Sequence, residues 1–164
     1  MLEFLCYIKW QEQDGPVPIT AVTEEELMFK TFVAIVTAFV AANVAAVEIT
    51  DSFLDAIVAV ESGGNASAIG DNGNAYGAYQ IHESYVNDVN RISGKNFTHA
   101  DAFDKKKAKE MVKIYLTNYG KNYEKKTGNT ATNEVLARIH NGGPNGWKKT
   151  ATQKYWNKVQ KELK

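Results

Sequence analysis

The sequence contains a single cysteine, Cys6, near the start of the chain. The rest of the chain therefore has neither a disulfide nor a cysteine-based metal site. Its three histidines, His82, His99 and His140, are scattered without the spacing of metal ligands, so we expect no metal and no cofactor. A repeat period, a phosphate-binding loop, a dinucleotide fingerprint and a Ser-His-Asp arrangement are also missing, which argues against repeat proteins, nucleotide-dependent enzymes and serine hydrolases.

A strong net charge is missing as well, because 19 basic and 19 acidic residues cancel. The balance differs along the chain. Residues 1–46 contain six acidic and two basic residues. Residues 47–164 therefore contain 17 basic and 13 acidic residues, a net charge of +4. A modest positive charge suits a protein that approaches anionic polymers, and it is too small and too dispersed to indicate nucleic-acid binding.

The sequence also lacks a hydrophobic run long enough to span a membrane. The most apolar stretch, residues 32–46, has about 15 residues where a bilayer needs about 20. Lys30 precedes it and Val44-Ala45-Ala46 ends it with small residues. Read from Met28, this pattern predicts a signal peptide over residues 28–46, with Val47 starting the mature chain. An uncleaved membrane anchor and a buried helix are the alternatives.

Residues 1–27 precede this predicted signal peptide. They include Gly15-Pro16-Val17-Pro18, which breaks regular structure, and an acidic run at positions 24–26. We expect this extension to lie outside the fold, as a misplaced start codon would explain. The remaining residues, 47–164, have the length of one domain, expected to be a secreted or periplasmic monomer without a stable membrane span.

From Ile49 onward the apolar residues recur at helical spacing, which predicts a mainly α fold. A first helix is expected to begin at a Thr50 or Asp51 cap and to end at Ser62-Gly63-Gly64. A glycine- and asparagine-rich stretch follows, with Asn72-Gly73 as a turn between short extended pieces. Further helical segments are expected over residues 80–92, from a Thr98 and Asp101 capping box toward residue 123, over 132–140 and over 152–163. The fold class is thus a helical bundle with a small β-like excursion after the first helix.

Glu61 is the first candidate for chemistry, because it continues the inward-facing stripe of Leu54, Ile57 and Val58 at the last turn of the first helix. Burial there disfavours the carboxylate charge, and the negative end of the helix dipole repels it. Both effects raise the pKa, as a general acid near neutral pH requires. The alternative is an ordinary surface glutamate at a frayed helix end.

Asp71 follows ten residues later within Gly70-Asp71-Asn72-Gly73. A helix, a glycine-rich turn and a returning strand can bring it across a cleft from Glu61. Glycosidic cleavage needs an acid for the leaving oxygen and usually a second carboxylate as nucleophile or base. The competing interpretation is a turn residue whose side chain bonds its own backbone beside Asn72-Gly73.

Two blocks of sequence resemble a known family. Glu61-Ser62-Gly63-Gly64, followed by Gly-Asp-x-Gly and Tyr76-Gly77-Ala78-Tyr79-Gln80-Ile81, looks like the catalytic half of the lysozyme-like superfamily. The tail, residues 137–146 together with residues 155–160, resembles the invertebrate-type lysozymes closely. The blocks span about residues 56–160. The short Glu-Ser-Gly and Gly-x-x-Gln-Ile pieces also occur in lytic transglycosylases, so they specify the superfamily better than the subtype.

The resemblance implies a lysozyme-like α+β fold with Glu61 as the general acid and Asp71 as the second carboxylate. It also implies that sugar-binding residues come from Ser62, Tyr76, Tyr79, Gln80, His140 and Asn141. His140 and Asn141 lie where a helix meets a glycine-rich loop, so a helix C-cap is the alternative role for them. Other aromatic residues, Tyr85, Trp147, Tyr155 and Trp156, are expected to be core or loop anchors.

This sequence departs from the animal members in two ways. It lacks their disulfides, with Trp147 where a cysteine is frequent, which indicates a bacterial or phage relative that relies on core packing. Its spacing between Asp71 and Gln80 is about one residue shorter, which puts the Asp71 assignment in question.

The function expected from these residues is hydrolysis of the β-1,4 bond between N-acetylmuramic acid and N-acetylglucosamine, with peptidoglycan as the partner. A lytic transglycosylase, which forms 1,6-anhydro ends with Glu61 alone, is the enzymatic alternative. A noncatalytic module that binds cell wall or chitin is a third hypothesis.

Overall fold

The computed structural model of the chain describes residues 47–163. The predicted extension, residues 1–27, and the predicted signal peptide, residues 28–46, both fall outside the described residues. Over residues 47–163 no helix combines the length and the apolar character needed to cross a bilayer.

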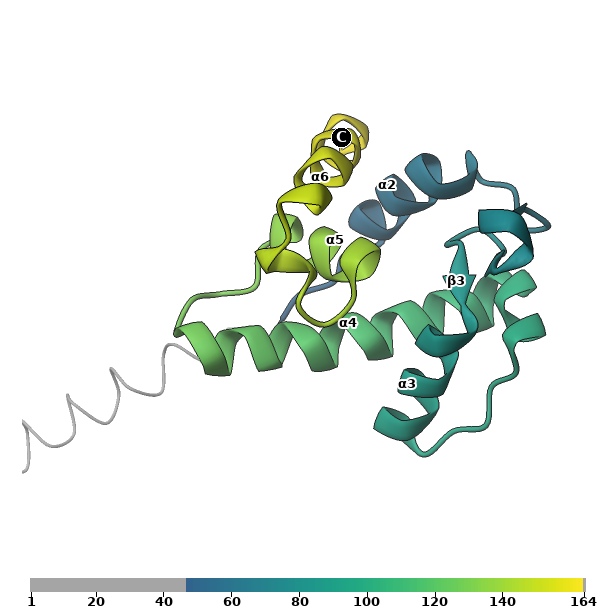
Figure 1. Cartoon of the computed structure of the whole chain (residues 1–164), viewed down its shortest axis with the longest axis horizontal. Helices are drawn as coiled ribbons and strands as arrows, with labels where there is room; N and C mark the ends of the chain where they lie inside the picture. The colour runs from purple at the N-terminus through teal and green to yellow at the C-terminus, as the bar shows by residue number, and fades with distance from the viewer. Residues whose placement is uncertain (1–46, 164) are drawn as a thin grey trace, which may run out of the picture. The chain divides into compact units, whose positions relative to one another are not determined.

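The first described helix, α2, spans Asp51–Ser62 and ends beside the small sheet (Figure 1). It begins where it does because the Thr50 side chain accepts a hydrogen bond from the Phe53 amide at 3.2 Å, which satisfies one of the free donors of the first turn. It ends at Gly63, whose φ of 61° lies in the left-handed region that glycine adopts without strain. The apolar face of α2, including Leu54 and Ile57, is fully buried.

Three two-residue strands form an antiparallel sheet in the order β1 (Ile69–Gly70), β2 (Ala75–Tyr76) and β3 (Ile81–His82). The short 3-10 turn η1, Asp71–Gly73, joins the first two strands. The register places Ala75 opposite His82 and Tyr76 opposite Ile81. Since residues that face each other across two strands point to the same side of a sheet, Ala75 and His82 share one face.

The remaining chain is helical and packs around a long central helix (Figure 1). Helix α4 packs against α3 and α5, while α6 packs against α2 and α5. At Gly120 of α4, an added Cβ would lie 3.0 Å from Leu136, so glycine lets α5 approach closely. These elements are α3 (Glu83–Ser93), η2 (His99–Phe103), α4 (Lys105–Thr127), α5 (Asn133–Gly142), η3 (Gly146–Lys148), η4 (Thr150–Thr152) and α6 (Gln153–Glu162).

The predicted fold class, mainly helical with a small β excursion after the first helix, is confirmed. Several boundaries differ from the prediction by one or more residues, and two of the differences have a clear structural cause. The second helix starts at Glu83 instead of residue 80, because Gln80 has a φ of 50° and the two residues after it pair in β3. The segment after Thr98 has the expected capping box, but Asp104 then caps a separate helix by accepting from the Lys106 and Lys107 amides.

Candidate active site

Glu61 lies in the last turn of α2, where the helix brings it to the edge of the core. Its side chain is 18% exposed. Burial raises the pKa of the Glu61 carboxyl from about 4.5 to about 6, and the nearby Tyr155 hydroxyl and Lys158 oppose this rise. A carboxyl with a pKa near 6 holds its proton more readily than an exposed glutamate and can still release it, as a general acid must.

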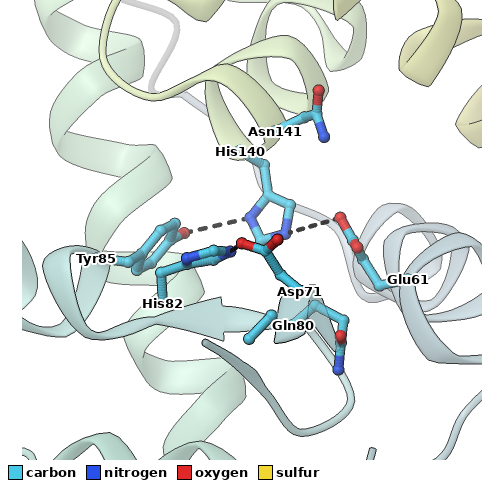
Figure 2. A pocket seen from close by; sticks show the side chains of 8 residues that line it. Glu61, Asp71, Gln80, His82, Tyr85, His140 and Asn141 are labelled. Atoms are coloured by element: carbon cyan, nitrogen blue, oxygen red, sulfur yellow. Dashed lines mark hydrogen bonds and ion pairs between the residues drawn. The ribbon is translucent and has the colours of Figure 1, made fainter. Parts of the chain in front are cut away.

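His140, near the end of α5, reaches the same carboxyl. Its Nε2 lies 3.6 Å from Glu61 Oε1, and its Nδ1 lies 3.4 Å from the Tyr85 hydroxyl (Figure 2). Burial lowers the pKa of His140 to about 4, although the backbone of Tyr79 opposes this shift. The imidazole is therefore neutral where Glu61 titrates, and the pair is not an ion pair. Because the His140 imidazole carries no positive charge, it does not lower the pKa of Glu61 as an imidazolium would.

Tyr155, from the first turn of α6, completes the surroundings of the acid. Its side chain is 9% exposed, and its hydroxyl has no hydrogen-bond partner of regular geometry within residues 47–163. Burial raises the pKa of this hydroxyl and the charge of Glu61 raises it further, so the hydroxyl keeps its proton. It lies near enough to Glu61 to stabilise the carboxylate that forms once the acid has given up its proton.

Asp71 stands at the start of η1, in a backbone conformation that few residues adopt. Its φ is 46° and that of Asn72 is 52°. Left-handed conformations cost free energy for residues with a Cβ and concentrate at functional sites, although aspartate and asparagine tolerate them best. The Asp71 carboxylate is exposed and lies 3.5 Å from His82 Nε2. The turn therefore holds a carboxylate out into solvent beside an imidazole.

Glu61 and Asp71 line one cavity of about 280 Å³, which we call the catalytic cavity (Figure 2). Three predicted sugar-binding residues, Gln80, His140 and Asn141, line it too. The glycine-rich stretch and the helix–loop junction of α5 thus meet at the end of α2, although they are far apart in sequence. The structure brings five of the eight predicted site residues together.

The other three predicted residues lie outside the lining of this cavity. Ser62 donates its hydroxyl to the Ala78 carbonyl at 2.8 Å, which ties the end of α2 to the segment after β2. Tyr79 is only 4% exposed and belongs to the core. Tyr76 stacks on His99 at 3.8 Å and lines a neighbouring cavity. Ser62 and Tyr79 therefore do not line the cavity but stabilise the segments that do.

Gln80 has a structural role in addition to its place in the cavity. Its amide nitrogen donates to the Gly77 carbonyl at 2.9 Å and to the Ala68 carbonyl at 3.4 Å. A Cβ on Gly70 would lie 2.1 Å from Gln80 Oε1, so a larger residue at this position would displace the Gln80 side chain from β1. Gln80 thereby fixes the loop that carries Asp71.

The sequence interpretation missed His82 as a functional candidate and took Tyr85 and Tyr155 for anchors alone. His82 and Tyr85 line the catalytic cavity, and Tyr85 also packs in the core by stacking on Tyr115 at 3.7 Å. The alternation of a strand does not point from Gln80 to His82, because Gln80 lies in a turn with a φ of 50° and the strand starts only at Ile81. Nothing in the sequence indicates that Tyr155 reaches Glu61. The region 47–163 contains no group of three or more potential metal-binding side chains.

Known proteins resemble this chain in sequence and in fold. The family model described as Destabilase matches residues 50–162. Among curated relatives, a lysozyme of Meretrix lusoria is 38% identical over 85 residues, which cover 52% of this chain and 65% of that protein. A lysozyme of Ostrea edulis is 37% identical over 86 residues, 52% of this chain and 58% of the relative. The chain thus matches about three fifths of the length of these curated relatives.

Solved structures agree with the sequence matches. The Meretrix lusoria lysozyme in complex with Aeromonas hydrophila PliI is 33% identical with a TM-score of 0.59, over 69% of this chain and 89% of that one. The Tapes japonica lysozyme is 29% identical with a TM-score of 0.57, over 68% and 89%. The expected resemblance to invertebrate-type lysozymes is therefore confirmed. By the match over residues 50–162, the chain belongs to the Destabilase family.

Proposed function

We propose that this protein hydrolyses the β-1,4 bond between N-acetylmuramic acid and N-acetylglucosamine in peptidoglycan. The observation that carries the proposal is the shared cavity: a carboxyl whose pKa burial raises to about 6 lies there with a second, exposed carboxylate. An acid for the leaving oxygen and a carboxylate for the developing cation are what glycosidic cleavage requires. Similarity to named lysozymes supports the same reaction.

In the proposed reaction Glu61 protonates the bridging oxygen and the bond to the anomeric carbon breaks. Asp71 stabilises the cation that develops there, or attacks it. Water then completes the cleavage and returns a proton to Glu61. After proton transfer, the Tyr155 hydroxyl and the charge of Lys158 stabilise the Glu61 carboxylate, since both favour its charged form.

His140 and Asn141 are proposed to orient the sugar. His140 stays neutral beside Glu61, so it can offer a polar N–H without competing for the proton of the acid. The exposed amide of Asn141 lines the same cavity and can pair with an N-acetyl group or a hydroxyl. Holding the reacting bond against the acid is a large part of the rate enhancement of such a site.

We also propose that the chain acts outside the cytoplasm, secreted or periplasmic, as a monomer made of residues 47–164. The support is the signal-like pattern of residues 28–46 and the family of lysozymes to which the chain is similar. Amino-terminal sequencing of the exported protein tests this proposal. A chain that starts at Val47 agrees with it, and a chain that retains residues 28–46 contradicts it.

Replacement of the acid tests the proposed reaction. Glu61→Gln keeps the size and hydrogen-bonding groups of the side chain but cannot donate a proton of the same acidity. We expect the release of soluble fragments from purified peptidoglycan to fall by about 10²–10⁴-fold, the usual contribution of general acid–base catalysis. Glu48→Gln, at an exposed position outside the cavity, is the matched control. Unchanged turnover in Glu61→Gln would reject the proposed mechanism.

A further inference from the structure

Two further cavities adjoin the catalytic cavity. The first, which we call the aromatic arm, has a volume of about 410 Å³ and adds residues of α3, α4 and the loop after α5: Ser84, Asp88, Tyr115, Gly143 and Pro144. The second, the polar arm, has a volume of about 400 Å³ and is lined by residues that include Asp71, Asn74, Glu83, Ser84 and His99. His82 lines all three cavities.

The residues that line more than one cavity indicate that the three cavities do not lie along one straight groove. In a straight groove, the two outer cavities would each adjoin the middle one and would share no residue with each other. Here the aromatic and polar arms have His82 and Ser84 in common. His82 therefore borders all three cavities, and a ligand that extends from the catalytic cavity into both arms would be branched at this residue.

The two arms differ in chemistry. The aromatic arm shares four residues with the catalytic cavity and is therefore its more continuous extension; its tyrosines, Tyr85 and Tyr115, stack on each other at 3.7 Å in the wall of the arm. The polar arm contains two carboxylates, Asp71 and Glu83. The glycan strand fits the first arm better than the second.

One wall of the polar arm is rigid. Tyr76 stacks on His99 with an angle of 4° between the rings. His99 Nε2 lies 2.7 Å from the Ile81 carbonyl, and since a carbonyl only accepts, this nitrogen carries a proton. The titratable groups that line this arm are Asp71, Tyr76, His82, Glu83 and His99, and no lysine or arginine lines it.

We infer that the polar arm receives the lactyl branch of muramic acid in its peptide-bearing form. The inference rests on the proposed function, since it concerns the substrate of the same site. In peptidoglycan the branch point is the lactyl group, whose carboxyl forms a neutral amide with the stem peptide. When an amidase removes the peptide, that amide becomes a carboxylate, which Asp71 and Glu83 repel. The protein accordingly prefers peptide-bearing strands over stripped ones.

Glu83 is the residue to change, because it is exposed at the first position of α3 and outside the catalytic cavity. The wild type, Glu83→Gln and Glu83→Lys are compared on intact peptidoglycan and on strands stripped by an amidase. We expect Glu83→Gln to raise kcat/KM on stripped strands by about two- to fivefold, the scale of one exposed charge interaction, and Glu83→Lys to raise it further. The ratio of turnover on stripped strands to turnover on intact peptidoglycan should rise in both variants, and this gain should shrink at high salt.

The matched control is Glu48→Gln, which removes the same charge at an exposed position that lines none of the three cavities. An unchanged ratio of the two turnovers in both Glu83 variants overturns the inference, as does an equal change in Glu48→Gln or a wild type that prefers stripped strands. If neither substrate is cleaved, it is the proposed function that fails. A thermal unfolding midpoint for each variant shows that it is folded.

Discussion

At the scale of single residues, the site contains two groups whose charges burial disfavours, Glu61 and His140. Burial raises the pKa of Glu61 to about 6 and lowers that of His140 to about 4. Between these values both side chains are neutral, although one is an acid and the other a base. A cationic histidine 3.6 Å from the carboxyl would favour its ionised form, and the burial of His140 prevents this. The proton that the proposed reaction needs is therefore retained on Glu61.

The Tyr155 hydroxyl limits the rise in the pKa of Glu61 that burial causes. Its hydroxyl lowers that pKa, so Tyr155→Phe should raise it above about 6. The alkaline limb of the kcat/KM profile, where the acid loses its proton, should then move to higher pH by several tenths of a unit or more. Because the hydroxyl has no regular partner within the described residues and favours the charged form of Glu61, we expect its removal to cost little stability at low pH, where Glu61 is protonated.

Tyr123→Phe serves as the control for this change, since Tyr123 packs edge-on against Trp147 and does not line the catalytic cavity. An alkaline limb that stays in place in Tyr155→Phe, or that moves to lower pH, would show that Tyr155 does not act on the acid.

Asp71 is tested by Asp71→Asn, which keeps the left-handed backbone because asparagine tolerates it as well as aspartate does. We expect kcat/KM on peptidoglycan to fall by about 10²-fold or more, since the developing cation loses its carboxylate. Asp55→Asn, an exposed change on α2, is the control. Near-full activity in Asp71→Asn would remove Asp71 from the mechanism and leave Glu61 to act alone.

The sequence predicted the residues of the site better than their roles. Glu61 could be found because helical spacing places it on the buried stripe of α2. Ser62 and Tyr79 belong to the same motifs, yet one bonds the Ala78 carbonyl and the other lies in the core. The contact between Tyr155 and Glu61 joins α6 and α2, which pack together but lie far apart in the sequence, and no local pattern encodes such a contact.

At the scale of elements, the end of α5 depends on a close contact with the turn that follows it. Gly146 in η3 is buried, and a Cβ there would lie 1.8 Å from the Arg138 carbonyl oxygen. Thr152 secures the same region by accepting from Arg138 Nε at 3.1 Å and donating to the Gly146 carbonyl at 2.8 Å. This turn holds the segment that carries His140 and Asn141.

Gly146→Ala should therefore force α5 and η3 apart. We expect the free energy of unfolding to fall by about 2 kcal/mol or more, as for other overpacked buried positions, with a parallel loss of activity. Urea unfolding at pH 7 measures the first effect and peptidoglycan turnover the second. Gly128→Ala is the contrasting control: it has open space around it but a φ of 72°, so strain alone should cost about 1 kcal/mol. Equal losses in the two variants would contradict the role given to this contact.

Helix boundaries were predictable where a local signal sets them. Thr50, one of the two predicted caps, does cap α2, and Gly94 ends α3 in the left-handed conformation typical of glycine, because caps act through neighbouring backbone groups. The start of α3 could not be predicted, since residues 81 and 82 pair with β2 and Gln80 bonds back to Ala68. Those partners are tertiary, and they override the helical spacing.

At the scale of the whole molecule, the described domain is stabilised by a core of interlocking helices. Its largest fully buried side chains come from α2, β3, α3, α4, α5 and α6. Each such apolar side chain contributes about 1.5–3 kcal/mol by leaving water. Burial of the Glu61 carboxyl lowers the stability of the fold when this carboxyl is ionised. The pKa of Glu61 is raised in the folded state, so its effect on stability is favourable below about pH 4.5 and is lost as the pH rises through about 6.

Glu61→Gln should therefore make the protein more stable at pH 7 while removing its activity. A rise in pKa from about 4.5 to about 6 corresponds to about 2 kcal/mol at neutral pH. Urea unfolding of the variant and the wild type, at pH 7 and again near pH 4.5, measures the difference. We expect Glu61→Gln to have the higher free energy of unfolding at pH 7, and we expect this difference to vanish near pH 4.5. A variant less stable than the wild type at pH 7 would show that the Glu61 carboxylate is not disfavoured by burial.

The most direct test of the central claim is the product formed from purified peptidoglycan in heavy-oxygen water. Hydrolysis with Glu61 as the acid predicts new reducing-end muramic acid residues that carry one heavy oxygen atom, as read by mass spectrometry, and their loss in Glu61→Gln. Unlabelled 1,6-anhydro ends would instead identify a lytic transglycosylase. Labelled ends that persist undiminished in Glu61→Gln would contradict the assignment of Glu61 as the catalytic acid.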